Sequence, residues 1–276
     1  IFADHCREIG RPPGWLSVPL VLTSHTWENA KNERSHQDPS MAEVMLGEPS
    51  DVSRVLFVPD YNTASVVMHR LYQTQGQIWT LVVPKMEVIP DLFSLQEATL
   101  LLEQGVLRLD WACHDLERQR VILTAVGAYQ LEEVLKASTR LKERQLPHSV
   151  VYMLEPGRFR TPRSEGEERH VAPANVRSEL YPNEVLARLF VTHTRPESIL
   201  GILQPLHTGK DTTAGLGFIN KGGTLNVPGM LFVNRCSWAH ILGEVAGILG
   251  MPKEELLTSE EGKVLEGRAS PEGVIF

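Results

Sequence analysis

The chain has few cysteines and no long apolar run, which argues against a disulfide framework, a zinc site and a membrane span. Only three of its 276 residues are cysteine, Cys6, Cys113 and Cys236, and they form no Cys-x-x-Cys pair. Their odd number and wide spacing argue against disulfides and zinc and fit a reducing, cytoplasmic setting, with Cys113 and Cys236 as packing residues. No apolar run approaches the roughly 20 residues that a membrane helix needs, so we expect no membrane partner.

Positive charge is also scarce. The chain carries 27 Lys and Arg against 34 Asp and Glu, which gives a net charge of −7 and a pI near 5.8. A broad nucleic-acid surface needs the opposite balance, so we expect no nucleic-acid partner, while a local basic pocket for a small phosphate is compatible with this composition. The length and a hydrophobic content of 42% allow one or two ordinary cores.

Functional groups are concentrated in residues 24–39, directly after an apolar run. These sixteen residues include two His, two Asn, a Lys and an Arg. In α/β folds, ligands collect in loops that follow the carboxyl ends of buried strands. Residues 24–39 are therefore the first candidate site.

Short apolar segments alternate with helical ones, which predicts an α/β fold with mostly parallel sheets flanked by helices, arranged in two units. In the first unit we expect strands at 17–23, 54–59 and 79–84 and helices at 41–46 and 63–75. A bridge over 85–110 contains a predicted helix at 95–104.

The second unit is predicted to open with a buried strand at 121–126 and a helix at 129–144. We expect further strands at 150–155 and 230–234, and helices at 184–190, 198–203 and 238–249. The polar stretch 156–182 is expected to be a loop or mobile insert, and the tail after residue 252 a helix with a loose end.

Several motifs resemble those of phosphoketolases, in the same order along the chain. The runs SHTW at 24–27 and SHQDP at 35–39 resemble the family's Ser-His-Val-Trp and Ser/Thr-His-Gln-Asp-Pro-Gly. RVLFVPDYNT at 54–63 resembles Arg-Val-Tyr-Leu-Pro-Pro-Asp-Ala-Asn-Thr, and VVPK at 82–85 stands where the family has Val-Ala-Gly-Lys. GFINKGGTL at 217–225 and MLFVN at 230–234 resemble its Gly-Tyr, Gly-Thr-Thr and Asp-Met-Val-Val-Leu-Asn elements.

The resemblance implies a thiamine-diphosphate enzyme of the transketolase superfamily. It implies a partial pyrimidine-binding-type domain over 1–92, a linker over 93–114 and a transketolase-like C-terminal domain over 115–276. The activity implied is cleavage of a ketose phosphate, with inorganic phosphate taking up the two-carbon unit as an acyl phosphate. The cofactor would supply the carbanion chemistry, and the protein would supply position, protons and charge.

The resemblance also implies two catalytic histidines. His36 matches a family histidine beside the cofactor, and an imidazole suits proton transfer near neutral pH. The alternative for His36 is a turn histidine that bonds the Asp-Pro backbone. His25 is placed similarly, with an orienting or packing role as its alternative.

Substrate contacts are implied for Arg7, Lys31, Lys85 and Asn32. The first three match positions that grip the sugar phosphate in the family, where cations give charge-assisted hydrogen bonds, although Lys31 replaces a histidine. Asn32 would bond substrate hydroxyls. The alternatives are solvated surface cations and an ordinary loop asparagine. The Gly-Gly-Thr run at 222–224 is expected to be a tight turn rather than a phosphate cradle.

Departures from the family leave three hypotheses open. The family's Asp-His-Asn-Gly-Phe has become AKNER at 30–34, and its Asp-Arg-Phe-His-Leu run has become CSWAHI at 236–241, both where substrate would be selected. The glutamate that activates the cofactor and the Gly-Asp-Gly motif for magnesium and diphosphate are expected ahead of this sequence. We therefore expect a fragment or subunit, with thiamine diphosphate and Mg bound only together with a missing domain, a second polypeptide or a second copy. The hypotheses are a phosphoketolase-like part, a thiamine-dependent transferase acting on another substrate, and a noncatalytic dimerisation or regulatory module.

Overall fold

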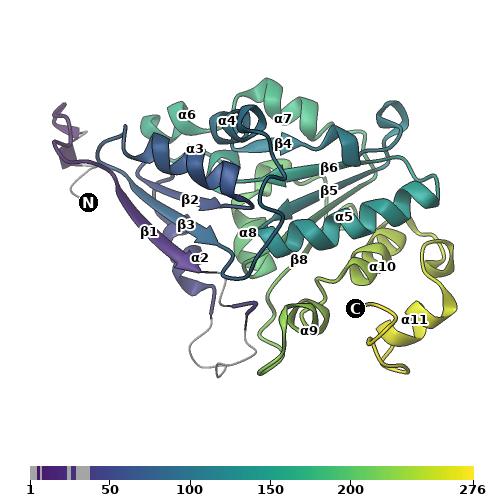
Figure 1. Cartoon of the computed structure of the whole chain (residues 1–276). Helices are drawn as coiled ribbons and strands as arrows, with labels where there is room; N and C mark the ends of the chain where they lie inside the picture. The colour runs from purple at the N-terminus through teal and green to yellow at the C-terminus, as the bar shows by residue number, and fades with distance from the viewer. Residues whose placement is uncertain (1–4, 7, 24–25, 29–37) are drawn as a thin grey trace.

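Two mainly parallel sheets flanked by helices form the protein (Figure 1). A computed structural model describes residues 5–6, 8–23, 26–28 and 38–276. The smaller sheet has the strand order β1-β3-β2 and the larger one the order β4-β6-β5-β7-β8, with β4 alone antiparallel to its neighbour. This confirms the predicted α/β class. Within the described residues, no helix combines the length and apolar character needed to cross a membrane.

The elements of the smaller sheet follow the sequence predictions closely. Its strands are β1 (Val18–Thr23), β2 (Ser53–Phe57) and β3 (Ile78–Val83), and its helices are α2 (Ser40–Gly47), α3 (Tyr61–Leu71) and α4 (Leu95–Gln104). Side chains alternate between the two faces of a strand, so β2 contributes to two separate cores. Leu56 lies in the core that contains α3 and α4, whereas Val55 and Phe57 lie in the core that contains α2.

The larger sheet is covered on both faces. Its strands are β4 (Val106–Arg108), β5 (Val121–Val126), β6 (His148–Met153), β7 (Ala187–Thr192) and β8 (Thr213–Leu216). Leu123 and Ala125 of β5 share a core with α5 (Ala128–Glu143) and α10 (Trp238–Leu249), whose ribbons run side by side in Figure 1. Ile122 and Val126 face the opposite core, which contains α7 (Ala174–Leu180) and α8 (Pro196–Ile202).

The helix predicted at 184–190 is wrong, because this segment leads into β7. All six residues of β7 are buried, and the strand pairs with β5 and β8. A central strand that is apolar on both faces lacks the two-residue alternation, so its pattern resembles that of a buried helix. Its one charged residue, Arg188, donates hydrogen bonds to the carbonyls of Tyr181, Pro182 and Leu206. The short strands β4 and β8 were not predicted.

The strand predicted at 230–234 is also wrong, because residues of α9 (Val227–Val233) occupy it. Asn226 caps the helix by accepting a hydrogen bond from the Gly229 amide at 3.0 Å. Pro228 lies in the first turn, where a missing amide hydrogen costs nothing. This Asn-x-Pro start outweighs the β-branched and aromatic composition that suggested a strand.

The stretch 156–182 is packed rather than loose, which corrects the prediction of a loop or insert. It contains η4 (Pro156–Phe159), α6 (Glu165–His170) and α7, and Phe159 is fully buried. The buried Glu167 accepts hydrogen bonds from the Ser50 amide at 2.9 Å and from the Arg163 guanidinium. Burial would raise the pKa of Glu167, but these donors lower it to about 2. Many polar side chains of the stretch are exposed, but Glu167 and the apolar residues attach its helices to the fold.

The end of the chain contains η6 (Lys253–Glu255) and α11 (Ser259–Leu265), and its last residues pack back onto α10. Trp238 Nε1 donates a hydrogen bond to the carbonyl of Ile275 at 3.1 Å, and Ile275 is buried. The helix predicted at 238–249 is confirmed, with Gly250 ending it at a φ of 64°.

Asp60 links the start of α3 to the segment that precedes α4. Its Oδ1 accepts from the Thr63 amide at 2.8 Å, which caps the helix, and its Oδ2 accepts from the Phe93 amide at 2.8 Å. The Asn62 side chain donates to the Phe93 carbonyl at 2.8 Å. One buried carboxylate therefore satisfies two backbone donors from segments 30 residues apart.

We expect Asp60→Ala to lower the free energy of unfolding by about 2 to 4 kcal/mol, because it removes a helix cap and leaves a buried amide without an acceptor. Urea denaturation followed by circular dichroism measures this change. Asp91→Ala, which alters an exposed aspartate of the same segment, should have little effect. Equal stability of the two variants would contradict the linking role of Asp60.

Candidate functional site

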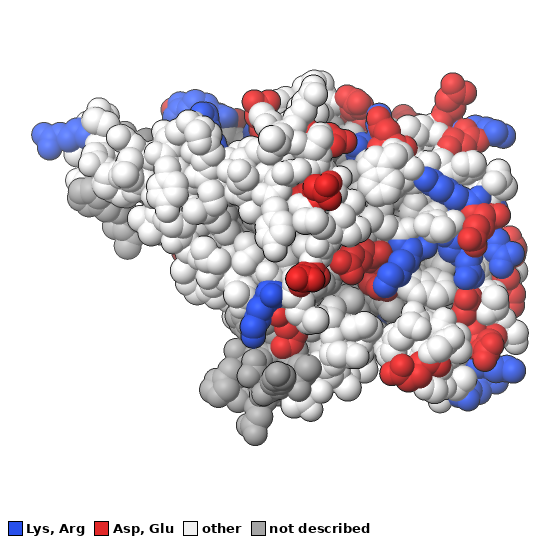
Figure 2. Space-filling model, viewed as in Figure 1, with Lys and Arg blue, Asp and Glu red and all other residues white. Residues whose placement is uncertain are grey.

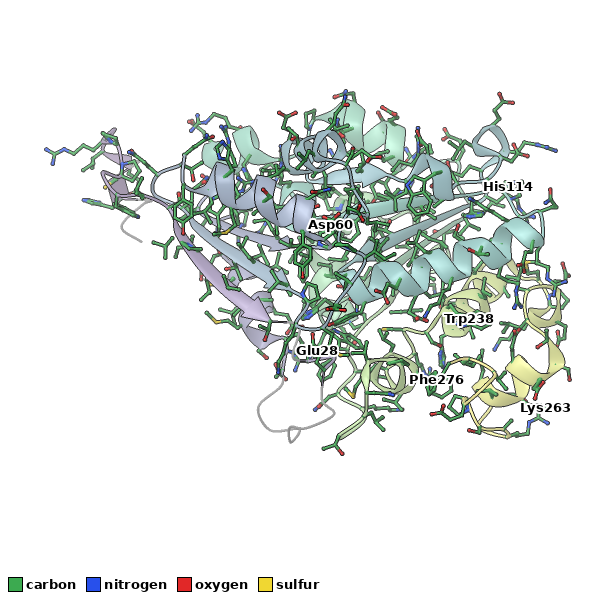
Figure 3. All side chains as sticks on the ribbon, in the orientation of Figure 1. Glu28, Asp60, His114, Trp238, Lys263 and Phe276 are labelled. Carbon is green, nitrogen blue, oxygen red and sulfur yellow. The ribbon has the colours of Figure 1, made fainter. Side chains whose placement is uncertain are left out.

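The carboxyl ends of strands from both sheets meet at Glu28, which follows β1 (Figure 3). Its Oε1 accepts hydrogen bonds from the amides of Lys85 at 2.7 Å and Met86 at 3.4 Å, just after β3. The hydroxyl of Tyr129, in the first turn of α5 after β5, donates to the same oxygen. Burial and the Glu28 carboxylate raise the pKa of Tyr129, so the phenol stays protonated and remains a donor.

Trp27 attaches the same segment to the ends of β7 and β8. The indole is fully buried, and its Nε1 donates to the carbonyl of His193 at 3.1 Å. Its ring meets those of His193 and Phe218 edge-on, with centroids 6.3 and 6.0 Å away. A buried aromatic of this size with its polar atom satisfied is a strong anchor.

The far end of the candidate loop is held by Arg195. Its guanidinium pairs with Asp38 and donates to Glu43 Oε2 at 2.5 Å, and its amide donates to Glu43 Oε1 at 2.8 Å. Burial would raise the pKa of Asp38, but hydrogen bonds from Ser40 and Arg195 outweigh it, and the pKa is lowered. Both described ends of the loop are therefore fixed to segments that follow strands of the larger sheet.

Gly127 lets these segments approach one another. It has a φ of 120°, and a Cβ there would lie 2.3 Å from Gln130 Oε1 and 3.1 Å from the Cβ of His193. Any side chain would therefore be strained and would displace the start of α5 from the end of β7. The Gly that follows the apolar run 121–126 is a requirement of the site's geometry.

Of the residues predicted for the site, the structure describes one. Lys85 lies beside Glu28, with its amide bonded to that carboxylate and its side chain exposed. The remaining predicted residues lie outside the described ones, and their roles stay predictions: Arg7, His25, Lys31, Asn32 and His36.

The Gly-Gly-Thr run is a turn, as predicted. Gly222 has a φ of 94°, and Asn234 holds the preceding segment by accepting hydrogen bonds from the amides of Ile219 and Lys221. Burial raises the pKa of the Cys113 and Cys236 thiols, as expected of packing residues.

Trp238, one of the altered positions, contacts other parts of the fold. Its amide donates to Glu133 Oε2 at 2.7 Å, its indole donates to Ile275, and Arg140 lies over its ring. Among the residues that the structure describes, its polar contacts are with α5 and the chain end. The altered segment thus has an evident packing role.

A metal centre is not formed by the described part of the chain. These residues contain no group of three or more His, Cys, Asp or Glu arranged to hold a metal ion. The carboxylates nearest the loop are engaged, since Glu28 accepts from three donors and Asp38 pairs with Arg195.

Sequence reasoning missed Glu28, Tyr129, His193 and Arg195. The last two follow β7, which had been predicted as a helix, so nothing placed them at a strand end. Tyr129 had a usable signal, because it comes two residues after the Gly that ends a buried strand. Glu28 had none, since its role depends on donors 57 and 101 residues away.

Arg195→Ala should release the segment after the loop, because it removes charge-assisted hydrogen bonds to Asp38 and Glu43. We expect faster amide hydrogen exchange in residues 38–47 and a loss of about 1 to 3 kcal/mol in unfolding free energy. Arg144→Ala, which alters an exposed arginine at the end of α5, is the control. Unchanged exchange in residues 38–47 would show that Arg195 does not hold the loop.

Comparison with known proteins relates the chain to one enzyme family. Residues 1–74 match the family described as D-xylulose 5-phosphate/D-fructose 6-phosphate phosphoketolase. A probable phosphoketolase of Pseudomonas putida is 31% identical over 128 residues, which cover 46% of this chain and 16% of that protein. A probable phosphoketolase of Bifidobacterium animalis subsp. lactis is 24% identical over 235 residues, which cover 83% and 28%. The chain thus spans well under a third of each relative.

Solved structures share the fold at low sequence identity. Transketolase from Leishmania mexicana has a TM-score of 0.61 and 13% identity, with 84% of this chain and 30% of that chain covered. A structure described as a split gene transketolase, inactive beta4 tetramer, has a TM-score of 0.58 and 14% identity, with 85% and 66% covered. The chain is therefore similar in sequence to phosphoketolases over part of its length, and it shares its fold with these solved transketolases.

Proposed function

We propose that this chain forms the substrate-facing wall of a thiamine-diphosphate-dependent, phosphoketolase-like site that cleaves a ketose phosphate to an acyl phosphate. The proposal rests on one observation: segments that follow strands of both sheets bond to the described ends of residues 24–39. Glu28 receives donors that follow β3 and β5, and Arg195, after β7, holds Asp38. The loop with the phosphoketolase-like motif is thus anchored at both ends where an α/β fold places its ligands.

Residues 1–92 and 115–276 would correspond to a pyrimidine-side and a C-terminal domain. The described residues do not fit the magnesium and diphosphate end of the cofactor, since they supply no cluster of metal ligands and their nearest carboxylates are engaged. Those groups would come from another polypeptide.

The cations of the loop region would bind the substrate's phosphate. The backbone of Lys85 is fixed by Glu28, and its exposed side chain is free to reach a ligand beside the loop. In this proposal Arg7 and Lys31 complete the phosphate contacts, Asn32 bonds sugar hydroxyls, and His25 and His36 handle protons near the reacting atoms.

A second polypeptide or a second copy would complete the site. Strand β1, at the edge of the smaller sheet, exposes the apolar side chains of Val18 (51%) and Val21 (56%). Another polypeptide that packs against this strand would bury them. Figure 2 shows few charged side chains on the visible surface over the smaller sheet, whereas both signs crowd over the C-terminal half. The similarity to a split gene transketolase chain also favours assembly from separate polypeptides.

The decisive experiment is an assay of the protein with its completing polypeptide, thiamine diphosphate and Mg²⁺. Fructose 6-phosphate and inorganic phosphate should yield acetyl phosphate, measured as its hydroxamate. Turnover that needs an aldose acceptor and no inorganic phosphate would indicate a ketol transferase instead. Cofactor-loaded assembly without turnover on either reaction would favour a noncatalytic module.

His36→Ala should lower turnover in this assay by about 10²- to 10⁴-fold, the range expected for loss of a general acid–base group. The circular dichroism spectrum and the midpoint of thermal unfolding should change little. His114→Ala, beside the start of β6 at the opposite end of the larger sheet, is the matched control. Near-normal turnover of the His36 variant would remove its catalytic role.

Lys85→Ala should weaken a phosphorylated substrate selectively. We expect KM for fructose 6-phosphate to rise about tenfold or more, the loss of one charge-assisted contact, with little change for fructose. Lys263→Ala, far along the chain on α11, is the control for a general charge effect. Equal effects on both sugars would contradict a phosphate contact.

A further inference from the structure

A second cationic site lies between α3, α4 and η4, at the other end of β3 from Lys85. A cavity of about 630 Å³ lies there, and its lining includes one carboxylate, Glu103. Three arginines and two histidines also line it: Arg54, Arg70, Arg158, His69 and His170. Arg54 lies level with Trp79 at the start of β3, and Lys85 comes six residues after Trp79. At about 3.3 Å per residue the two regions are roughly 20 Å apart.

The buried carboxylate beside the cavity, Glu155, is already paired with Arg54 and His170. Glu155 is buried and forms a two-point pair with Arg54, at 2.8 Å to Nε and 2.6 Å to Nη2. Its Oε1 also lies 2.9 Å from Nε2 of His170. Burial would raise the pKa of Glu155, but Arg54 and His170 hold it well below its usual range, so this carboxylate stays ionised.

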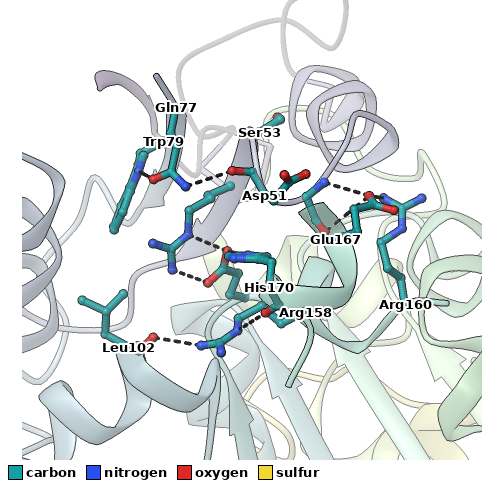
Figure 4. Close-up of polar contacts among 12 residues, drawn as sticks. Asp51, Ser53, Gln77, Trp79, Leu102, Arg158, Arg160, Glu167 and His170 are labelled. Carbon is teal, nitrogen blue, oxygen red and sulfur yellow. Dashed lines mark hydrogen bonds and ion pairs between the residues drawn. The ribbon is translucent and has the colours of Figure 1, made fainter. Parts of the chain in front are cut away.

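Arg158 adds a cation that forms no ion pair with a carboxylate among the described residues. Its Nε donates to the His170 carbonyl at 3.0 Å, and its Nη1 donates to the Leu102 carbonyl at 3.3 Å (Figure 4). Nη1 also donates to the Glu103 carbonyl, near the end of α4. Burial lowers the pKa of Arg158. Backbone carbonyls and the nearby charge of Glu155 offset the cost of burying this charge, and because Glu155 already pairs with Arg54, the cavity wall keeps a net positive charge.

Arg70 and His69 bring the last turn of α3 to the same cavity. Both are exposed, and within the described residues Arg70 forms none of the ion pairs of the fold. The Arg54–Glu155 ion pair has a structural role, because it joins β2 of the smaller sheet to the end of β6 in the larger one. Arg158 and His170 are positioned by the hydrogen bonds described above, and His69 Nε2 lies 2.9 Å from Gln73 Nε2. Arg70, by contrast, lines the cavity without an ion pair among the described residues. These side chains come from three different elements, α3, η4 and α6.

We propose that this cavity binds a phosphate monoester dianion, with Arg70 and Arg158 contacting the phosphate and the remaining volume holding the organic part. Guanidinium groups match phosphate oxygens with paired hydrogen bonds, and 630 Å³ suits a small metabolite. Ser65, Gln73 and Thr99 provide polar lining for hydroxyl groups. Because the site joins α3 to η4 and α6, the ligand stabilises the contact between the two sheets.

Isothermal titration calorimetry with glycerol 3-phosphate tests the proposal on the protein in its completed assembly, in phosphate-free buffer at about 150 mM salt, where surface charges are screened. We expect saturable binding with a Kd near or below about 1 mM, and no binding of glycerol. Arg70→Ala should weaken binding about tenfold, and Arg70→Glu should abolish it. Arg144→Ala, which also alters an exposed arginine at a helix end, should leave Kd unchanged.

Lys85→Ala separates this site from the proposed substrate site. Unchanged affinity for glycerol 3-phosphate in that variant, together with slower hydrogen exchange in residues 65–73 and 99–104 on binding, supports the cavity. Loss of binding in Lys85→Ala would assign the ligand to the strand ends and overturn the proposal. Absence of saturable binding, or equal losses in Arg70→Ala and Arg144→Ala, would overturn it as well.

Discussion

The two sheets meet where β2 runs beside the end of β6, and the rest of the structure depends on this joint. Arg54 and Glu155 form a buried ion pair across it, and the Phe57 amide donates to the Leu154 carbonyl at 2.8 Å. A buried ion pair adds little net stability compared with apolar packing, but loss of one partner would leave an uncompensated charge. The pair therefore fixes how the sheets are placed more than how stable they are.

That placement brings the carboxyl ends of the two parallel sheets to one edge. The ring of Phe57, at the end of β2, lies 5.7 Å from that of His193, which follows β7. Tyr129 can then bond Glu28, and Arg195 can pair with Asp38, at the two described ends of residues 24–39. The same joint creates the cationic cavity at the other end of β3, because Glu155 cannot neutralise all the cations that meet there.

Much of the fold could be predicted from the sequence, and the failures have a common physical cause. Helices with caps and one apolar face, such as α4 and α10, were predicted correctly, because their signals are local. β7 was mistaken for a helix, since a strand buried on both faces loses its alternation. α9 was mistaken for a strand, because composition was weighed above its Asn226 cap. The polar stretch 156–182 looked loose, although Phe159, Val176 and Leu180 pack into the core and Glu167 bonds the distant Ser50 amide.

The sequence by itself determined the α/β class and the similarity to phosphoketolases, and it pointed to residues 24–39 as the candidate site, because these depend on local patterns and ordered motifs. Only the tertiary structure decided which groups hold that loop, since Glu28 meets Tyr129 across 101 residues and Asp38 meets Arg195 across 157. It also revealed the cavity around Arg70 and Arg158. Contacts between residues so far apart depend on how the sheets join, which no local pattern encodes.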